Sequence, residues 1–388
     1  TKSITRFARN TVTLLETARE LKELGVNLMV SIWPTVDQRT DNYKKMSECG
    51  YLMHMDRGMP IHGTWMGPCT YYDAINPGAR KFVWDCAKKN YYDLGIKLFW
   101  LDEAEPEINA YDADNYRYFD GPALLCANEY PKCYIQGFYE GMKEQGDEGI
   151  CHLIRCAWAG SQKYGALLWS GDVESTFNAM RKQLSAGLNA GMAGIPWWTC
   201  DIGGFLGGFT AHKDFQELLV RWFQMGAFLP VMRLHGDRLP YTEPPVKYYG
   251  QVERFGTGAG NEVWSFGEDN YEILKKYILI REILKPYIEK LMAEAHEKGT
   301  PVIRATFFQY PDDPDAPKAE DQYLFGSDLL VAPVFAAGAQ ERSVYLPKGD
   351  AWREVATGKT YEGGQAVTAK APIDVIPLFV RVGADLPL

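Results

Sequence analysis

Several features that mark common protein classes are missing from this sequence of 388 residues. No apolar run approaches the ~18 residues that a membrane span needs, so no transmembrane segment is expected. The eight cysteines form no CxxC pair and no Cys/His ligand spacing, and HExxH is absent, which argues against a metal centre or a redox dithiol. No GxGxxG follows a strand-like segment, which disfavours a doubly wound dinucleotide-binding sheet.

An excess of positive charge is also missing. Lys and Arg number 41 against 50 Asp and Glu, and the net charge of -9 would repel a phosphate backbone, so nucleic acid is not an expected partner. The N-terminus, TKSITRFARN, shows no charged segment followed by an apolar one, so no signal peptide is apparent. Together with the cysteine usage, this predicts a cytoplasmic location.

Aromatic residues, in contrast, are abundant at 13% of the chain. Flat amphipathic rings suit either a large core or a cleft that binds sugars. Most of these rings are expected in the core.

Helical segments alternate with short apolar ones over the first three quarters of the chain. The first such helix is predicted over residues 11–24, followed by Gly25 as its cap. Continuous apolar segments that alternate with helices are typical of parallel strands in βα units. Six strands are predicted, near residues 27–33, 96–102, 151–156, 166–172, 193–200 and 227–233.

Polar or aromatic residues follow each of these strands, as in a (β/α)8 TIM barrel, whose active site lies at the C-terminal ends of its strands. A barrel has eight strands, so the first two would precede residue 1 and the chain would be N-terminally truncated. The missing strands would then be supplied by another chain or segment, or would simply not be represented in this sequence.

The pattern changes after a helix predicted over residues 271–298. Short strand-like segments separated by turns follow, which predicts a small antiparallel β-sandwich. We therefore expect a catalytic barrel domain over residues 1–298 and a β-sandwich domain over residues 299–388.

Two strand ends carry the most suggestive acids, Asp102 in KLFWLDEAEPE and Asp172 in LLWSGDVEST. Retaining glycosidases need two carboxyl groups roughly 5–5.5 Å apart, one as nucleophile and one as acid/base. On spacing alone this signal is weak, and helix capping or surface ion pairing is the favoured explanation of such residues.

Six motifs in a fixed order favour the interpretation of Asp102 and Asp172 as a pair of glycosidase carboxyl groups. The chain resembles glycoside hydrolase family 31, the α-glucosidase and α-xylosidase family, over nearly its whole length. The motifs are FWLDEAEPE (99–107), WSGD (169–172), WWTCDIGGF (197–205), MRLHG (232–236), FGSDLLVAPV (325–334) and TGKTYEGG (357–364).

The resemblance implies roles for individual residues. Asp102 corresponds to the family's nucleophile and Asp172 to its general acid/base. Arg155 is similar to an arginine that meets the sugar and the nucleophile, where a cation would keep Asp102 ionised. Asp201 and His235 match positions that hydrogen-bond the sugar in the −1 subsite.

Three tryptophans are candidate substrate-binding residues. Trp65 looks like the family's subsite tryptophan, and Trp169 precedes the acid/base, although both fit a core role as well. Trp33, in SIWPT, stands where many α-glucosidases of the family carry Asp and where α-xylosidases resembling this chain carry Trp. Its indole would fill the space of a hexose hydroxymethyl group and so favour a pentose.

The charged residues near these candidates are expected to have no direct role in catalysis. Glu103 is expected in solvent or in a salt bridge, Glu105 is expected to help position its loop, and Asp237 and Arg238 are expected to be ordinary polar loop residues.

The resemblance thus implies a retaining α-glycosidase that needs no metal or cofactor. It would remove a non-reducing terminal sugar, preferably α-xylose, from an oligosaccharide, and would form a homo-oligomer. An α-glucosidase or transglycosylase of the same family is the alternative, and an inactive sugar-binding fragment is the second one.

Overall fold

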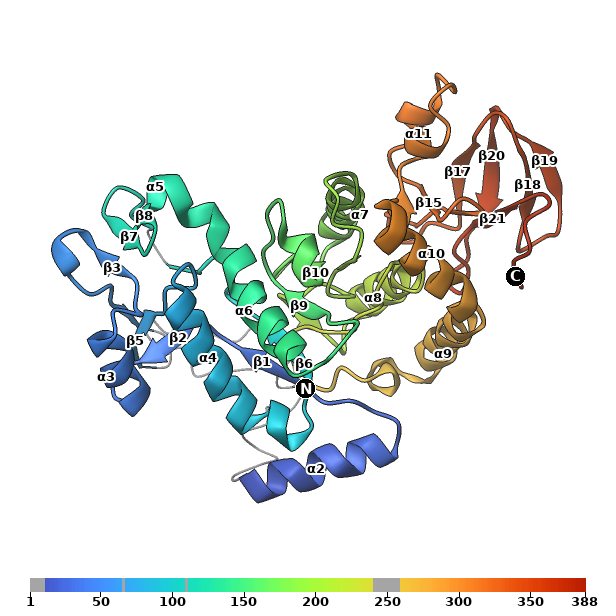
Figure 1. The fold of residues 1–388 in the computed structure, drawn as a ribbon. Helices are drawn as coiled ribbons and strands as arrows, with labels where there is room; N and C mark the ends of the chain where they lie inside the picture. The colour runs from blue at the N-terminus through green and yellow to red at the C-terminus, as the bar shows by residue number, and fades with distance from the viewer. Residues whose placement is uncertain (1–10, 65–66, 109–110, 240–258) are drawn as a thin grey trace. The chain divides into compact units, whose positions relative to one another are not determined.

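A computed structural model of the chain describes residues 11–64, 67–108, 111–239 and 259–388 (Figure 1). Contacts between residues group into two compact units, which meet in the sequence between residues 169 and 170. Among the described helices, none is long and apolar enough to cross a membrane. The eight cysteines are free thiols.

A parallel sheet organises the first unit, and its strands run side by side in the order β1, β6, β9, β10 (Figure 1). Each strand lies inside a segment for which the sequence predicts one, so these four predictions are confirmed. Helices in the connections make this a βα architecture. The strands are β1 (Met29–Ile32), β6 (Leu98–Leu101), β9 (His152–Ile154) and β10 (Ala166–Trp169), and the longer connecting helices are α4 (Pro77–Asn90) and α6 (Tyr130–Glu144).

Register in this sheet decides which side chains meet beyond its C-terminal edge. Leu101, the last residue of β6, pairs with Ile32 of β1 and with Ile154 of β9. The next residue of each strand, Trp33, Asp102 and Arg155, therefore begins its loop at the same edge.

Local signals explain why the surrounding helices begin and end where they do. Asn76 caps α4 by accepting hydrogen bonds from the N–H groups of Gly78 and Ala79, and Pro77 occupies its first turn. The first predicted helix is confirmed as α2 (Thr11–Glu23), with Gly25 in the left-handed conformation after it.

Two small antiparallel sheets, β2-β5-β4 and β3-β7-β8, decorate the connections of the first unit. Their bounds, with those of the short helices nearby, are β2 (Thr35–Asp37), α3 (Asp41–Glu48), β3 (His54–Met55), β4 (Gly63–Thr64), β5 (Pro68–Tyr71), β7 (Tyr116–Tyr118), β8 (Gly121–Pro122) and α5 (Ala123–Cys126).

The second unit begins with further βα segments. Thr176 caps α7 through its hydroxyl group, which accepts from the N–H of Ala179. The elements are α7 (Phe177–Met192), β11 (Trp198–Thr199), β12 (Gly208–Phe209), α8 (Lys213–Gly226), β13 (Arg238–Leu239), α9 (Glu268–Ile283) and α10 (Lys285–Lys298).

The strand predicted over residues 227–233 does not form. The Arg281 guanidinium group takes the carbonyl oxygens of Ala227, Leu229 and Pro230, and Pro230 has no N–H to give to a ladder. The Arg281 side chain thus donates the hydrogen bonds to these backbone carbonyl oxygens that a neighbouring strand would otherwise have donated.

The helix predicted over residues 271–298 is two helices, because Leu284 separates α9 from α10. Pro286, in the first turn of α10, cannot donate a backbone hydrogen bond, which favours a break here. The predicted end is confirmed, since Gly299 adopts the left-handed conformation after Lys298.

Antiparallel strands make up the rest of the second unit, as the sequence predicts. A six-stranded sheet and a two-stranded sheet share a core that includes Leu330, Val344, Trp352 and Phe379. The elements are β14 (Ile303–Arg304), α11 (Thr306–Gln309), β15 (Tyr323–Phe325), β16 (Leu329–Val331), β17 (Glu341–Leu346), β18 (Ala351–Glu354), β19 (Thr360–Glu362), β20 (Gln365–Lys370) and β21 (Leu378–Arg381).

Arg221 of α8 ties this helix to the antiparallel domain. Its side chain is 1% exposed and donates hydrogen bonds to four backbone carbonyls, those of Ala339, Ala371, Pro372 and Val375. We expect Arg221→Met to lower the free energy of unfolding by about 3 kcal/mol, because several buried acceptors lose their donor. Urea unfolding measures this, with exposed Arg181→Met as the matched control; equal stability of the two variants would contradict the expectation.

Candidate active site

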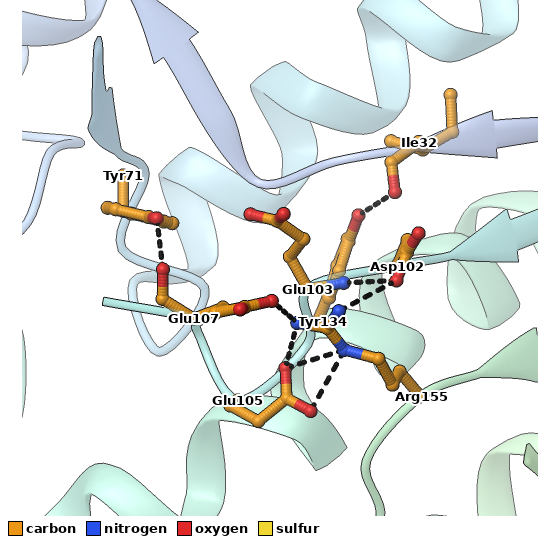
Figure 2. Close-up of polar contacts among 8 residues, drawn as sticks. All are labelled: Ile32, Tyr71, Asp102, Glu103, Glu105, Glu107, Tyr134 and Arg155. Atoms are coloured by element: carbon orange, nitrogen blue, oxygen red, sulfur yellow. Dashed lines mark hydrogen bonds and ion pairs between the residues drawn. The ribbon is translucent and has the colours of Figure 1, made fainter. Parts of the chain in front are cut away.

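Asp102 lies directly after β6, at the C-terminal edge of the parallel sheet (Figure 2). Its backbone N–H donates to the Ile32 carbonyl at 3.0 Å, which extends the pairing of β6 with β1 by one residue. The carboxylate accepts the N–H of Glu103 at 2.8 Å and a hydrogen bond from the Trp33 side chain. Only 15% of the Asp102 side chain is exposed, so two donors fix a mostly buried acid.

Arg155 follows β9 and reaches the same point. Its backbone N–H donates to the Leu101 carbonyl at 3.2 Å, and its Nη1 lies 3.5 Å from Oδ1 of Asp102. The guanidinium group also binds Glu105 through two atoms, at 2.9 and 3.0 Å, and donates to a carboxylate oxygen of Glu107. One arginine thus bridges three carboxylates (Figure 2).

Opposing effects set the charge of Asp102. Burial raises the pKa of its carboxyl group above the ordinary value, whereas the positive charge of Arg155 lowers it. The hydrogen bonds from Glu103 N–H and from Trp33 lower the pKa further, and the nearby Glu105 raises it. The balance leaves the pKa raised, which makes Arg155 the main support of the ionised form.

Tyrosines fix the loops around this cluster. The Tyr71 hydroxyl donates to the Glu107 carbonyl, and the Tyr134 hydroxyl donates to the Ile32 carbonyl at 2.8 Å (Figure 2). Sequence reasoning missed both tyrosines and the role of Glu107. Glu107 was within reach of that reasoning because it ends the motif FWLDEAEPE, but no sequence signal distinguishes the two tyrosines among the 23 in the chain.

The expectation for Glu105 agrees with its contact to Arg155, but the expectation for Glu103 is wrong. The Glu103 side chain is only 7% exposed, and it takes part in no ion pair among the described residues. The left-handed backbone of Glu103, with φ at 51°, turns its side chain inward after the strand ends.

Trp33, predicted as a pocket-narrowing residue, is half-buried at the end of β1. Besides contacting Asp102, it lines a cavity of about 270 Å³ whose walls include Tyr72, Phe82 and Cys86. Since indole N–H is the only polar group of this side chain, the contact with Asp102 uses that donor. Trp33 therefore acts on the acid itself, which sequence reasoning did not foresee.

The other two predicted tryptophans differ in position. Trp169, the last residue of β10, is 1% exposed and packs edge-on against Trp100 with ring centroids 5.6 Å apart. Trp65 lies outside the described residues. A role for either in binding sugar stays a prediction.

Asp172 belongs to the second unit and lies in the loop between β10 and α7. Its side chain is exposed, as suits a group that must exchange protons with substrate and water. The chain reverses in this region through Gly171, which has a φ of 77°.

Asp201 and His235, both predicted sugar ligands, lie on two loops of the second unit that are joined by arginines. Asp201 is fully buried and pairs with Arg233, and the Ile202 N–H donates to the Arg233 carbonyl at 3.1 Å. Oδ2 of Asp201 is buried without a hydrogen-bond partner among the described residues, so it can accept a ligand hydroxyl group.

Arg238, expected to be an ordinary loop residue, is fully buried instead. It donates to the carbonyl oxygens of Ile202 and Gly204 at 2.8 Å and to that of His235 at 3.2 Å, so it clamps the two loops together. A Cβ at Gly236 would approach its Nη1 to 2.4 Å, which explains the glycine beside it.

His235 is held in its neutral form. Burial lowers the pKa of the imidazole to about 3, and the charges of Arg233 and Arg238 lower it further. Its ring lies 5.4 Å from that of Phe205, centroid to centroid. A neutral imidazole offers one donor and one acceptor, which suits hydroxyl groups.

Two patterns of one protein family match the chain. The pattern of the Glycosyl hydrolases family 31 TIM-barrel domain matches residues 5–291, and that of the Glycosyl hydrolase family 31 C-terminal domain matches residues 299–384. The expected TIM barrel, followed by a small antiparallel β domain, is thereby confirmed as the fold.

Individual relatives agree with these matches. The uncharacterized family 31 glucosidase ORF2 of Pseudescherichia vulneris is 57% identical over 221 residues, which are 57% of this chain and 42% of that protein. An α-xylosidase of Saccharolobus solfataricus is 34% identical over 382 residues, covering 95% of this chain and 46% of that protein.

Among solved structures, a GH31 α-xylosidase from a soil metagenome, complexed with xylose, superimposes with a TM-score of 0.91 at 56% identity. The match covers 96% of this chain and 55% of that one. The chain therefore spans about half the length of the relatives it matches.

Proposed function

The chain belongs to glycoside hydrolase family 31, and on this basis we propose that it carries the active site of a retaining α-glycosidase. The observation that carries the proposal is the mostly buried Asp102 carboxylate, aligned by two hydrogen-bond donors and faced by the Arg155 cation. An acid so placed at the C-terminal edge of a barrel strand is suited to attack an anomeric carbon.

The reaction is a double displacement. Asp102 attacks C1 of the terminal sugar while Asp172 gives its proton to the departing oxygen, so the C1–O bond to the aglycone breaks as the C1–O bond to Asp102 forms. Asp172, now ionised, then takes a proton from water, and the hydroxide released attacks C1 and frees Asp102. The sugar leaves with its original anomeric configuration.

Asp201 and His235 bind the sugar in this proposal. The unpartnered Oδ2 of Asp201 accepts a sugar hydroxyl, and the neutral His235 donates to another. A charged imidazole would repel the oxocarbenium-like transition state, so the low pKa of His235 favours catalysis.

The preferred sugar is α-xylose, at the non-reducing end of an oligosaccharide. The names of two relatives, both α-xylosidases and one of them bound to xylose, support this choice. The Trp33 indole supports it as well, because a ring fixed against the nucleophile occupies space that a hydroxymethyl group would need. The relative named as a glucosidase favours the alternative, an α-glucosidase.

Three further expectations belong to this proposal. The catalytic domain ends at Lys298, where α10 ends, and a β-sandwich domain begins at Gly299. The eight free thiols support a location in the cytoplasm. Assembly into a homo-oligomer follows from the family resemblance, and light scattering of the purified protein tests it.

Initial rates on 4-nitrophenyl α-xyloside and 4-nitrophenyl α-glucoside test the activity and its selectivity. We expect kcat/KM to be at least about 10-fold higher for the xyloside, because the removal of one hydroxymethyl group relieves a clash worth about 1–3 kcal/mol. Faster hydrolysis of the glucoside would establish the α-glucosidase alternative. Binding of both sugars without turnover would instead identify the chain as a sugar-binding fragment.

A further inference from the structure

Glu103 stands out because its side chain is largely buried while its carboxylate oxygens can still be reached from solvent. The side chain is 7% exposed, and its carboxylate makes no hydrogen bond or ion pair among the described residues. Burying an acid without a partner costs free energy, and such groups in folded proteins usually meet a hydrogen-bonding partner. The oxygens of Glu103 are not among the fully enclosed atoms that lack a partner, so water or a ligand hydroxyl group can reach them and serve as that partner.

The backbone of Glu103 also has an uncommon conformation. With φ at 51° the residue adopts the left-handed conformation, which disfavours side chains other than those of Gly, Asn and Asp. The same conformation directs its N–H at the Asp102 carboxylate, 2.8 Å away. Glycine would adopt this conformation with less strain than glutamate.

Arg155 forms no ion pair with Glu103, although it contacts the other three carboxyl groups of the cluster. The guanidinium group contacts Asp102, Glu105 and Glu107. Figure 2 shows the Glu103 carboxyl group pointing away from Arg155 and Glu105. Three of the four carboxyl groups in this cluster contact Arg155, and the fourth, Glu103, is next in sequence to the candidate nucleophile.

The charged and titratable groups around Glu103 come from four segments. Its own loop contributes Asp102, Glu105 and Glu107, the residue after β9 is Arg155, and β5 and α6 contribute Tyr71 and Tyr134. Burial raises the pKa of Glu103 to about 7, with Glu107 adding to the rise. Around neutral pH the carboxyl group can therefore donate a hydrogen bond in one state and accept one in the other.

We propose that Glu103 binds a hydroxyl group of the sugar whose C1 is attacked by Asp102, and that its ionised carboxylate is the stronger-binding form. This inference rests on the proposed function, since it places the sugar over Asp102. A hydroxyl group is the partner that fits, because it can donate to a carboxylate and is small enough to follow C1 into a mostly buried site. Charge-assisted hydrogen bonds of this kind are roughly twice as strong as neutral ones.

Binding of free xylose, followed by calorimetry, tests the assignment in three proteins. In Glu103→Met, which keeps the volume but loses the acceptor, we expect the Kd for xylose to rise by about 10- to 100-fold. Exposed Glu148→Met is the matched control and should bind like the wild type. The kcat/KM for 4-nitrophenyl α-xyloside should fall in Glu103→Met by a similar factor.

The pH dependence provides a readout that a purely structural role would not change. In the wild type, xylose binding should tighten as pH rises through about 7, because the stronger acceptor forms there. Glu103→Gln keeps the shape of the side chain and cannot ionise, so this part of the pH dependence should vanish. The glutamine variant carries the test even where the methionine variant fails to fold.

The outcomes separate the two hypotheses. A wild type that neither binds xylose nor hydrolyses either aryl glycoside overturns the proposed function. A wild type that hydrolyses the xyloside, with both Glu103 variants matching it in xylose affinity and pH dependence, overturns only the role of Glu103.

Discussion

Asp102→Ala is expected to lower kcat/KM for 4-nitrophenyl α-xyloside by at least about 10⁴-fold, the loss typical when a covalent nucleophile is removed. The reason is specific to the geometry. The Asp102 carboxylate is contacted by the N–H of Glu103 and by the Trp33 side chain, and no other carboxylate of the cluster receives both contacts. Glu105 and Glu107 also bind Arg155, but only Asp102 directly follows β6 at the edge of the sheet.

A small external anion makes this test sharper. Removing the Asp102 side chain leaves room for azide to attack C1 from the same face, so the C1–N bond forms as the bond to nitrophenolate breaks. We expect added azide to restore part of the rate in Asp102→Ala and to give a glycosyl azide of inverted configuration. The matched control is exposed Asp85→Ala on α4, which should keep the wild-type rate. Full activity of Asp102→Ala would remove Asp102 from the mechanism.

The sequence predicts the strands of the parallel sheet well, because continuous apolar segments such as the one ending at Leu101 have few other uses. It fails at residues 227–233, which are just as apolar. There the carbonyl groups are taken by Arg281, which lies about fifty residues later in the chain. Contacts of this range leave no local sequence signal, so a periodicity argument cannot detect them.

Some residues of the candidate site can be predicted from the sequence, whereas others can be recognised only in the fold. The family resemblance identifies Asp102 and Arg155, and the register of β6 with β9 brings the two residues together as the strand assignment requires. The motifs do not distinguish Glu103 from Glu105, since both are acids beside the candidate nucleophile. Only the fold shows that Glu105 is bound to Arg155, whereas the largely buried Glu103 makes no ion pair among the described residues.

The position of Arg238 illustrates a third limit. Within the HGDR segment it reads as a polar loop residue, and its burial depends on three glycines that leave room for the guanidinium group, Gly203, Gly208 and Gly236. Glycines are common in loops, so their joint purpose appears only when the loops are seen side by side. The clamp on Ile202 and His235 carbonyls then explains how two separate motifs present their side chains together.

Arg155→Met is expected to reduce kcat/KM by about 10²-fold or more and to change the pH profile. Burial already raises the pKa of Asp102, and Arg155 is the strongest influence that lowers it. Without the cation the pKa rises further, and the freed charges of Glu105 and Glu107 add to the rise. Since only the ionised Asp102 attacks C1, its active fraction at a given acidic pH falls, and the acidic limb of the profile moves to higher pH.

Arg155→Lys separates charge from geometry in this prediction. A lysine restores the positive charge but cannot bind Glu105 through two atoms, so the acidic limb should return toward that of the wild type while kcat stays low. Profiles of kcat/KM from about pH 4 to 9 for the three proteins provide the measurement. A methionine variant with reduced kcat and an unmoved acidic limb would show that Arg155 orients the loop without keeping Asp102 ionised. The structure favours the electrostatic role as well, because Nη1 of Arg155 faces Oδ1 of Asp102 at 3.5 Å in a site where both side chains are mostly buried.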